Sequence, residues 1–246
     1  VKWVGDRTDA MLSDAQGRDL VTEAEGAFDA EGRILAFRWR STSNLGAYYS
    51  SFGAGIHTVL SAPVMGGMYR VPALHLTVEG AFTNTTPTDA YRGAGRPEQI
   101  YVTERLMEQA ARETGRDVAE FRKLNLITPG ELPFPTAGGM TFDSLSPAEN
   151  VDRCVAAADR DGFEARRAEA ASRGRLLGFG LAYYMERTGG GPVEHAEIRI
   201  TPNGACEIRV GTQSTGQGHE TAWAQIVSET LGLDWDSISL MEGDSD

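Results

Sequence analysis

Hydrophobic and polar positions alternate with a period of two in several short stretches of the chain, which is typical of strands. Residues 21–28 and 33–41 show this pattern on either side of the turn DAEG at residues 29–32, so we expect a β-hairpin. The pattern returns over residues 74–85. Residues 44–67 are rich in Gly, Ser and Tyr with weak periodicity, which predicts loops with at most one short helix.

The middle of the chain has the residue spacing of helices. Ile100, Met107 and Ala111 share one helical face, and Gly115 is a fitting C-terminal end for this long helix. Asp117 can cap a short helix that follows it.

Two more helices and a domain boundary are expected further on. Ser146-Pro147-Ala148-Glu149 combines a capping hydroxyl, a proline at the first helical position and a glutamate at the third, so a helix should begin there. A second helix is expected over residues 161–173. The Gly- and Pro-bearing stretch 128–139 is the best candidate boundary, which predicts a first domain over residues 1–135 and a second over residues 136–246.

The C-terminal part is predicted to combine strands with one helix. Strands are expected at residues 176–187, 193–201 and 205–212, followed by a glycine-punctuated loop at 211–218, a helix at 219–231 and a last strand. The whole succession predicts an α+β fold in which mixed sheets pack against helices.

Composition and charge exclude several classes of function. Of the 246 residues, 41% are hydrophobic and 24% charged, as in soluble globular proteins, and no apolar run is long enough to cross a bilayer. The formal net charge of −12 argues against nucleic acid or an anionic membrane as a partner. Cys154 and Cys206 are too few for an iron–sulfur cluster or a disulfide framework, so a cytoplasmic location is expected. The first residues have neither an initiator Met nor a signal-peptide pattern, and the last follow a strand-like run directly, so we expect both ends to be internal to a longer protein.

Two glycine-rich loops are the candidate functional sites. The strand end, glycine loop and helix over residues 211–231 point backbone N–H groups and a helix N-terminus at one place, which suits an anion. Residues 90–98 place two glycines and two arginines in a tight loop, which suits an anion or a cofactor. Each loop also has a plain interpretation as a turn between strand and helix, with Arg96 and Glu98 on the surface in the second case.

Other polar residues carry weaker signals. The four histidines are scattered, and no set of His, Cys or carboxylates has zinc-ligand spacing, so no metal ligand is expected in this chain. Only His219, which opens the last helix, is a functional candidate among them. Glu186, beside Tyr183 and Tyr184, is the least ordinary carboxylate, although a solvated strand end is the simpler interpretation.

Three motifs occur in a fixed order along the chain. They are Val1-Lys2-Trp3 with Gly17-Arg18-Asp19, then Ala90-Tyr91-Arg92-Gly93-Ala94-Gly95-Arg96-Pro97-Glu98, and finally Gly211-Thr212 through Gly216-Gln217-Gly218-His219. Together they resemble the molybdopterin-binding large subunit of the xanthine dehydrogenase, aldehyde oxidase and carbon monoxide dehydrogenase family. The resemblance covers essentially the whole chain, and three ordered motifs are far more specific than one glycine pattern.

The resemblance implies which residues form the site. The implied cofactor-binding residues are Ala90, Arg92, Gly93, Gly216, Gln217, Gly218 and His219. Tyr91 would border the substrate pocket beside the molybdenum centre, and Gln217 would contact the pterin and the oxo group of the metal. These two are therefore the candidate catalytic residues.

The resemblance also implies a reaction and partners. Members of the family oxidise a small molecule such as an N-heterocycle or an aldehyde with oxygen derived from water. The implied cofactor is molybdopterin cytosine dinucleotide with molybdenum, and electrons would pass to an iron–sulfur small subunit and an FAD-containing medium subunit in a dimer of heterotrimers. The family's catalytic glutamate and its upstream glycine–phenylalanine motif are expected to lie outside this chain, so the fragment alone should be inactive.

Two departures from the family pattern bear on the substrate. Copper-containing carbon monoxide dehydrogenases have a cysteine where this chain has Gly93, and purine-oxidising members have an arginine where it has Leu60, upstream of Tyr69. N-heterocycles other than xanthine, or aldehydes, are therefore favoured. A carbon monoxide dehydrogenase-like large chain, a catalytically inactive scaffold paralogue and an unrelated nucleotide-binding module remain as alternatives, and the last lacks both the dinucleotide fingerprint and the phosphate-loop lysine.

Overall fold

The computed structural model describes residues 4–187 and 193–243, and the chain divides into two compact units, Val1–Glu186 and Arg187–Asp246. The first unit contains α1 (Arg7–Ser13), β1 (Leu20–Phe28), β2 (Ile34–Gly46), α2 (Gly53–His57), the 3-10 helix η1 (Ala62–Val64), β3 (Leu74–Phe82), α3 (Arg96–Glu113), α4 (Val118–Asn125), the 3-10 helix η2 (Pro129–Glu131), β4 (Phe134–Pro135), β5 (Thr141–Phe142), α5 (Pro147–Ala157) and α6 (Phe163–Ser172). The second contains β6 (Ala196–Ile200), β7 (Cys206–Val210), α7 (His219–Leu231), the 3-10 helix η3 (Trp235–Ser237) and β8 (Ile238–Glu242).

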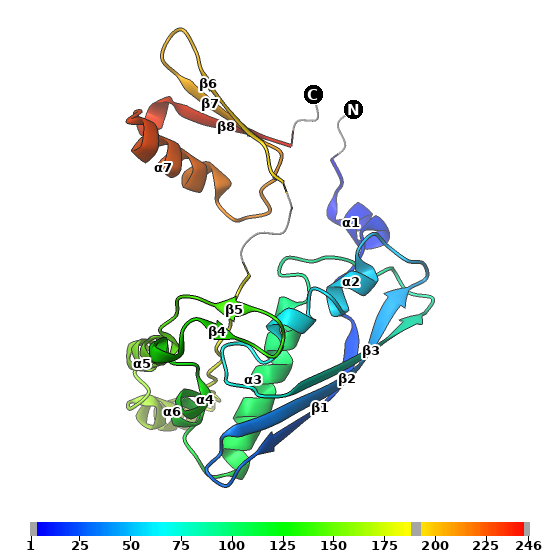
Figure 1. Ribbon diagram of the computed structural model, residues 1–246, viewed down its shortest axis with the longest axis vertical. Coiled ribbons are helices and arrows are strands. Elements are labelled where there is room, and N and C mark those ends of the chain that lie inside the picture. Colours follow the sequence, from blue (N-terminus) through cyan, green and yellow to red (C-terminus); the bar gives the residue numbers. More distant parts are fainter. Residues whose placement is uncertain (1–3, 188–192, 244–246) are drawn as a thin grey trace. The chain divides into compact units, whose positions relative to one another are not determined.

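The first unit is built on a three-stranded sheet with the order β1-β2-β3, and α3 lies against one of its faces (Figure 1). β1 and β2 form the predicted antiparallel hairpin, and β3 pairs with β2 in parallel. Phe37 and Trp39 of β2 are each 1% exposed and belong to one core with Met107 of α3. The hairpin, the strand after it and the long helix are thus confirmed, because period-two and helical patterns were both present locally.

Two helices of the first unit begin where the sequence predicts, but only one is capped as expected. The Asp117 carboxylate accepts hydrogen bonds from the Ala119 and Glu120 amides and so caps α4. α5 begins at Pro147, yet the Ser146 side chain makes no capping hydrogen bond, so that part of the prediction was wrong. A proline pre-set for the helix is sufficient to start it without the hydroxyl.

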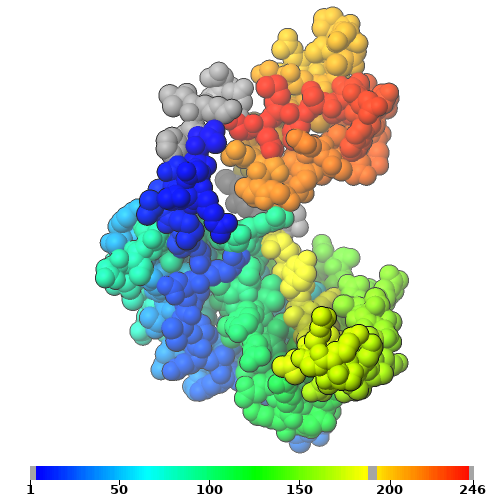
Figure 2. All heavy atoms as spheres, turned by 180° about the vertical axis from the view of Figure 1, so that it is seen from behind, coloured from blue at the N-terminus to red at the C-terminus, as the bar shows by residue number. Residues whose placement is uncertain are grey.

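The predicted strand at residues 176–187 does not form. This stretch has no regular secondary structure and lies on the surface of the first unit beside α3 and α5, where Figure 2 shows it in yellow. Leu181 and Tyr183 pack against the core, and the Phe179 ring stacks under the Arg160 guanidinium at 4.8 Å. The alternating apolar residues therefore contact helices instead of pairing with a strand, a choice that local sequence cannot reveal.

The second unit is a three-stranded sheet with the order β6-β7-β8 and one helix. β6 and β7 form a hairpin, and β7 pairs with β8 in parallel across the connection through α7. Cys206, Ile208 and Val227 form its small buried core. The predicted strands near 193–201 and 205–212, the helix and the last strand are confirmed, and with them the mixed α+β class. The domain boundary after residue 135 stays a prediction.

Candidate functional site

The first candidate loop follows β3 and is held by the segment that precedes β1. The Gln16 amide donates to the Pro87 carbonyl at 2.9 Å, and the Asp89 amide donates to the Gln16 carbonyl at 2.8 Å. Burial acts to raise the pKa of Asp89, but hydrogen bonds, including one from the Ala90 amide at 2.6 Å, hold that pKa below its usual value. The chain is therefore fixed in place just before the motif begins.

The loop itself is a tight turn that leads into α3. The Ala94 amide donates to the Tyr91 carbonyl at 2.7 Å, and Gly93, Ala94 and Gly95 have φ angles of 96°, 40° and 93°. A Cβ atom on Gly95 would lie 2.3 Å from the carbonyl oxygen of Ile56, so only glycine fits at the helix N-cap. The three left-handed residues turn the chain so sharply that α3 begins at the next residue.

Three ionisable side chains to which the sequence analysis gave no role lie at this turn. Arg18 Nε is 3.7 Å and His57 Nε2 is 3.8 Å from the same oxygen of Glu98, whose side chain is only 9% exposed. The interpretation that placed Glu98 on the surface is therefore wrong. Burial lowers the pKa of His57, outweighing the nearby Glu98 and Asp19 carboxylates, so the charge of Glu98 is balanced chiefly by Arg18.

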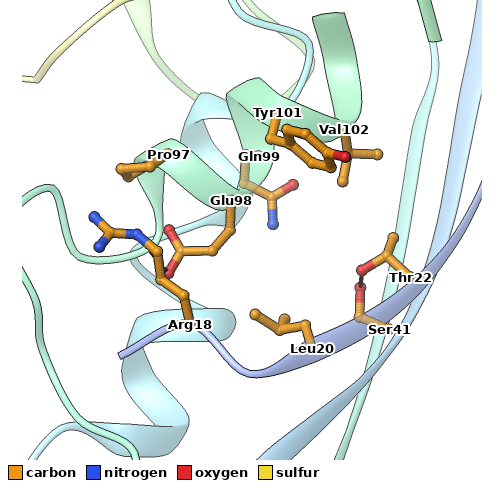
Figure 3. Close-up of a pocket in the computed structure, with 9 residues that line it drawn as sticks. All are labelled: Arg18, Leu20, Thr22, Ser41, Pro97, Glu98, Gln99, Tyr101 and Val102. Atoms are coloured by element: carbon orange, nitrogen blue, oxygen red, sulfur yellow. Dashed lines mark hydrogen bonds and ion pairs between the residues drawn. The ribbon is translucent and has the colours of Figure 1, made fainter. Parts of the chain in front are cut away.

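A cavity of about 500 Å³ lies between β1 and the first turns of α3 (Figure 3). Its lining residues are Arg18, Leu20, Thr22, Ser41, Pro97, Glu98, Gln99, Tyr101 and Val102. The Thr22 and Ser41 hydroxyls bond to each other at 2.8 Å on the strand side. On the helix side, Gln99 Oε1 and Glu98 Oε2 are buried without a hydrogen-bond partner in the protein.

The second candidate loop joins β7 to α7 in the second unit. Gly216 and Gly218 have φ angles of 96° and 77°. Nothing lies within 4 Å of the position that a Cβ atom on Gly218 would occupy. The side-chain oxygen of Gln217 accepts a hydrogen bond from the Thr215 amide, so this side chain is folded onto its own loop. The loop thus combines an open face with a polar side chain that can be redirected.

Glu242 holds the middle of this loop and the residue that follows it. One carboxylate oxygen accepts from the Ser214 amide at 3.0 Å, and the other lies 3.2 Å from His219 Nδ1. The sequence analysis missed Glu242 because only the parallel pairing of β7 and β8, which sets it opposite Val210, brings it to the loop.

The second loop fits an anionic cofactor. Gly218 is the N-cap of α7, and no side chain makes a capping hydrogen bond to the amides of the first turn. Such amides carry partial positive charge and need acceptors. In the first loop Gly93 has no open space, because a Cβ atom there would lie 2.7 Å from Pro97 Cγ. That glycine shapes the turn, whereas Gly218 leaves room for a ligand.

The predicted site residues fall into two sets, one in each unit. Residues 90–93 form the start of the first turn, where Tyr91 is 63% exposed, and residues 216–219 form the end of the second loop. Their roles stay predictions. Within the described ranges, no three His, Cys, Asp or Glu side chains are grouped so that they can hold a metal ion. The motif Val1-Lys2-Trp3 lies outside the described residues.

The chain is similar to known proteins along its whole length. Models of a molybdopterin cofactor-binding domain match residues 1–126 and residues 153–246. The gamma subunit of the 6-hydroxypseudooxynicotine dehydrogenase complex from Paenarthrobacter nicotinovorans is 33% identical over 100% of this chain and 32% of its own length. The carbon monoxide dehydrogenase large chain of Hydrogenophaga pseudoflava is also 33% identical, with the same two coverages.

A solved structure gives the same picture. Quinoline 2-oxidoreductase from Pseudomonas putida 86 superposes with a TM-score of 0.87 at 30% identity, over 98% of this chain and 32% of that protein. The chain therefore spans about a third of the length of the relatives it matches.

Proposed function

The chain belongs to the molybdopterin cofactor-binding domain family, and we propose that its two glycine loops hold a molybdenum cofactor in the large subunit of a hydroxylase. The observation that carries the proposal is the second loop, where the uncapped N-terminus of α7 faces open space at Gly218. Backbone amides at such a place bind phosphate or pterin oxygens without arginine or lysine, which suits a protein with a net charge of −12.

Each candidate residue has a role that its surroundings allow. The amides after Gly218 would donate hydrogen bonds to the anionic part of the cofactor, and His219 would be held toward it by Glu242. Gln217 would exchange the Thr215 amide for a cofactor atom, since its side chain has both a donor and an acceptor. The exposed ring of Tyr91 would border the substrate pocket.

The backbone at Ala90, Arg92 and Gly93 would help to position the cofactor, because this turn is fixed by hydrogen bonds and positive φ angles. When bound, the molybdenum group supplies the two-electron oxidation of a substrate carbon with oxygen derived from water. The residues of this chain would bind and orient the cofactor and enclose the substrate. The catalytic glutamate of the family would be supplied by another part of the full-length protein.

The proposal also specifies the form of the cofactor, the partner subunits and the location of the protein. We propose molybdopterin cytosine dinucleotide, an iron–sulfur small subunit and an FAD medium subunit in a dimer of heterotrimers in the cytoplasm. The names of the relatives, a gamma subunit of a complex and a large chain, support a multi-subunit assembly. The two cysteines of this chain are too few to bind a cluster. Among the described helices, none has the length and apolar character needed to cross a membrane.

For the substrate we propose an N-heterocycle or an aldehyde. Quinoline, named for the solved relative, is an N-heterocycle. Carbon monoxide is the alternative because a carbon monoxide dehydrogenase large chain is equally similar in sequence. Gly93 disfavours it, since a glycine offers no thiolate for copper and has no room for a cysteine side chain beside Pro97.

A pair of glycine substitutions tests the cofactor site. Gly218 and Gly232 cap opposite ends of α7 with φ angles of 77° and 69°, and neither has an atom within 4 Å of an added Cβ. Gly218→Ala and Gly232→Ala should therefore cost the same free energy of folding, about 1 kcal/mol each. Only Gly218→Ala would put a methyl group at the cofactor.

The measurement is the molybdenum and released nucleotide content of the full-length protein purified with its partner subunits. We expect stoichiometric molybdenum with cytosine nucleotide in the wild type and in Gly232→Ala, and about tenfold less in Gly218→Ala. Equal loss in both variants would show that folding alone is responsible. A well-folded wild-type complex without molybdenum would instead favour the inactive scaffold.

A further inference from the structure

Arg18 has a backbone conformation that is unusual for a residue with a side chain. Its φ angle is 59°, in the left-handed region that favours glycine. A residue stays in this region only where its surroundings fix it, and such residues concentrate at functional sites. The contacts that fix Arg18 lie on the first candidate loop, more than seventy residues away in sequence.

The side chain of Arg18 contacts three successive parts of that loop. Its Nη2 donates a hydrogen bond to the Arg92 carbonyl, its Cζ lies 4.7 Å from the centroid of the Tyr91 ring, and its Nε lies 3.7 Å from Glu98 Oε1. A planar guanidinium can stack on an aromatic ring, donate a hydrogen bond and pair with a carboxylate at the same time. A lysine ammonium group is not planar and cannot stack on a ring in this way.

The neighbouring Gly17 holds the other end of Tyr91. A Cβ atom on Gly17 would lie 2.7 Å from the Cβ of Tyr91, so the tyrosine stem rests directly on the glycine backbone. Gln16 joins this segment to residues 87–89 by two backbone hydrogen bonds. The stem of Tyr91 is thus fixed by main chain, while its exposed ring is oriented by the Arg18 guanidinium.

We propose that Arg18 is a positioning residue. It sets the orientation of the Tyr91 ring and the position of the Arg92 carbonyl on the substrate side of the cofactor. This rests on the proposed function, in which Tyr91 borders the substrate pocket. Arg18 acts through Tyr91 and does not itself touch substrate. Its pairing with Glu98 anchors the guanidinium to the first turn of α3, so that the loop and the helix move as one body.

Three variants of the full-length complex test this. Arg18→Gly removes every side-chain contact, including the pairing with Glu98, and accepts the left-handed backbone without strain. Arg18→Lys keeps the charge near Glu98 and loses the stacking and the fork geometry. Arg160→Gly is the matched control, because Arg160 also lies over an aromatic ring, that of Phe179 at 4.8 Å, in a part of the first unit that contains no candidate site residue.

Two measurements are made on each variant: hydrogen–deuterium exchange of the peptide that contains residues 89–96, and steady-state turnover of quinoline. In Arg18→Gly we expect the turn amides to exchange about tenfold faster and kcat/KM to fall by about tenfold to a hundredfold, with molybdenum content unchanged. In both the exchange rate and kcat/KM, Arg18→Lys should be closer to Arg18→Gly than to the wild type. Arg160→Gly should have wild-type values of both.

Wild-type exchange in Arg18→Gly, or full rescue by Arg18→Lys, would overturn the proposal, the latter because charge alone would then suffice. Failure of the proposed function has a different signature. A wild-type complex without molybdenum would refute the cofactor site, whereas a complex that contains molybdenum but does not turn over quinoline would refute only quinoline as the substrate. In both cases the exchange of residues 89–96 would still decide whether Arg18 orders the loop.

Discussion

His57 shows how burial decides the state of a single residue. Its side chain is 2% exposed, its Nδ1 is hydrogen-bonded to the Ser43 hydroxyl, and its Nε2 is 3.8 Å from Glu98. A carboxylate at this distance favours the protonated ring, but desolvation opposes it and is the larger effect, so the pKa is lowered from 6.5. The neutral ring is therefore part of the folded state beneath the first loop.

This predicts acid sensitivity of the first unit. Because the pKa of His57 in the folded protein lies below 6.5, the unfolded chain binds a proton at a pH where the folded chain does not. The neutral His57 therefore contributes its full stabilisation of the fold above pH 6.5, and this stabilisation is lost as the pH falls through the folded pKa. Local unfolding of the first unit, measured by hydrogen exchange at about pH 7.5 and about pH 5.5, should increase more in the wild type than in His57→Gln. Equal increases would refute this role of His57.

At the scale of elements, α3 and α4 are joined by buried polar groups. Arg122 is fully buried, and its Nε donates to Glu104 Oε2 at 2.8 Å. The Tyr69 hydroxyl donates to the other oxygen of Glu104 at 2.6 Å. Burial, with the Glu104 charge, raises the pKa of Tyr69 well above 10.0, so Tyr69 stays a donor. The cluster joins the middle of α3 to α4 and to Tyr69.

Removal of one partner should be costly because the other is left buried and charged. We expect Arg122→Met to lower the free energy of opening of α4 by about 3–5 kcal/mol. Arg112→Met is the control, since Arg112 is 69% exposed and pairs with Glu108 on the helix surface, an interaction worth about 0–1 kcal/mol. Hydrogen exchange of α3 and α4 in the full-length protein measures both. A similar small effect in the two variants would mean that Glu104 is solvated after the change.

At the scale of the whole molecule, the two units carry one candidate loop each, and each loop follows a strand and leads into a helix. The cores of the units lie elsewhere, around Trp39 and Met107 in the first and Ile208 in the second. A ligand that binds such a loop stabilises it without changing the core of its unit, because the ligand binds only the folded loop.

Removal of the cofactor should therefore act on the loops alone. In full-length protein produced without molybdenum cofactor, residues 89–95 and 212–218 should exchange amide hydrogens faster than in the loaded protein, while the amides of β2 and β7 should not change. Faster exchange throughout both units would mean that the cofactor supports the fold itself and that these loops are not a preformed site.

Most helices and strands and the two candidate loops could be predicted from local patterns in the sequence. The hairpin of β1 and β2, the long α3, the Asp117 cap and α7 all arise from interactions between residues a few positions apart, which the chain records as periodicity and capping residues. The glycines at 93, 95, 216 and 218 were visible for the same reason, since each serves a local backbone conformation.

The polar groups that surround those loops could not be predicted in this way, because they come from distant parts of the chain. Arg18 reaches Tyr91, His57 reaches Glu98, and Glu242 reaches His219 across separations that carry no periodic signal. The stretch 176–187 has the alternation of a strand and yet lies against helices, because a strand exists only where a partner edge is available. Local patterns fix backbone conformation, whereas burial and charge pairing depend on where the folded chain brings distant residues together.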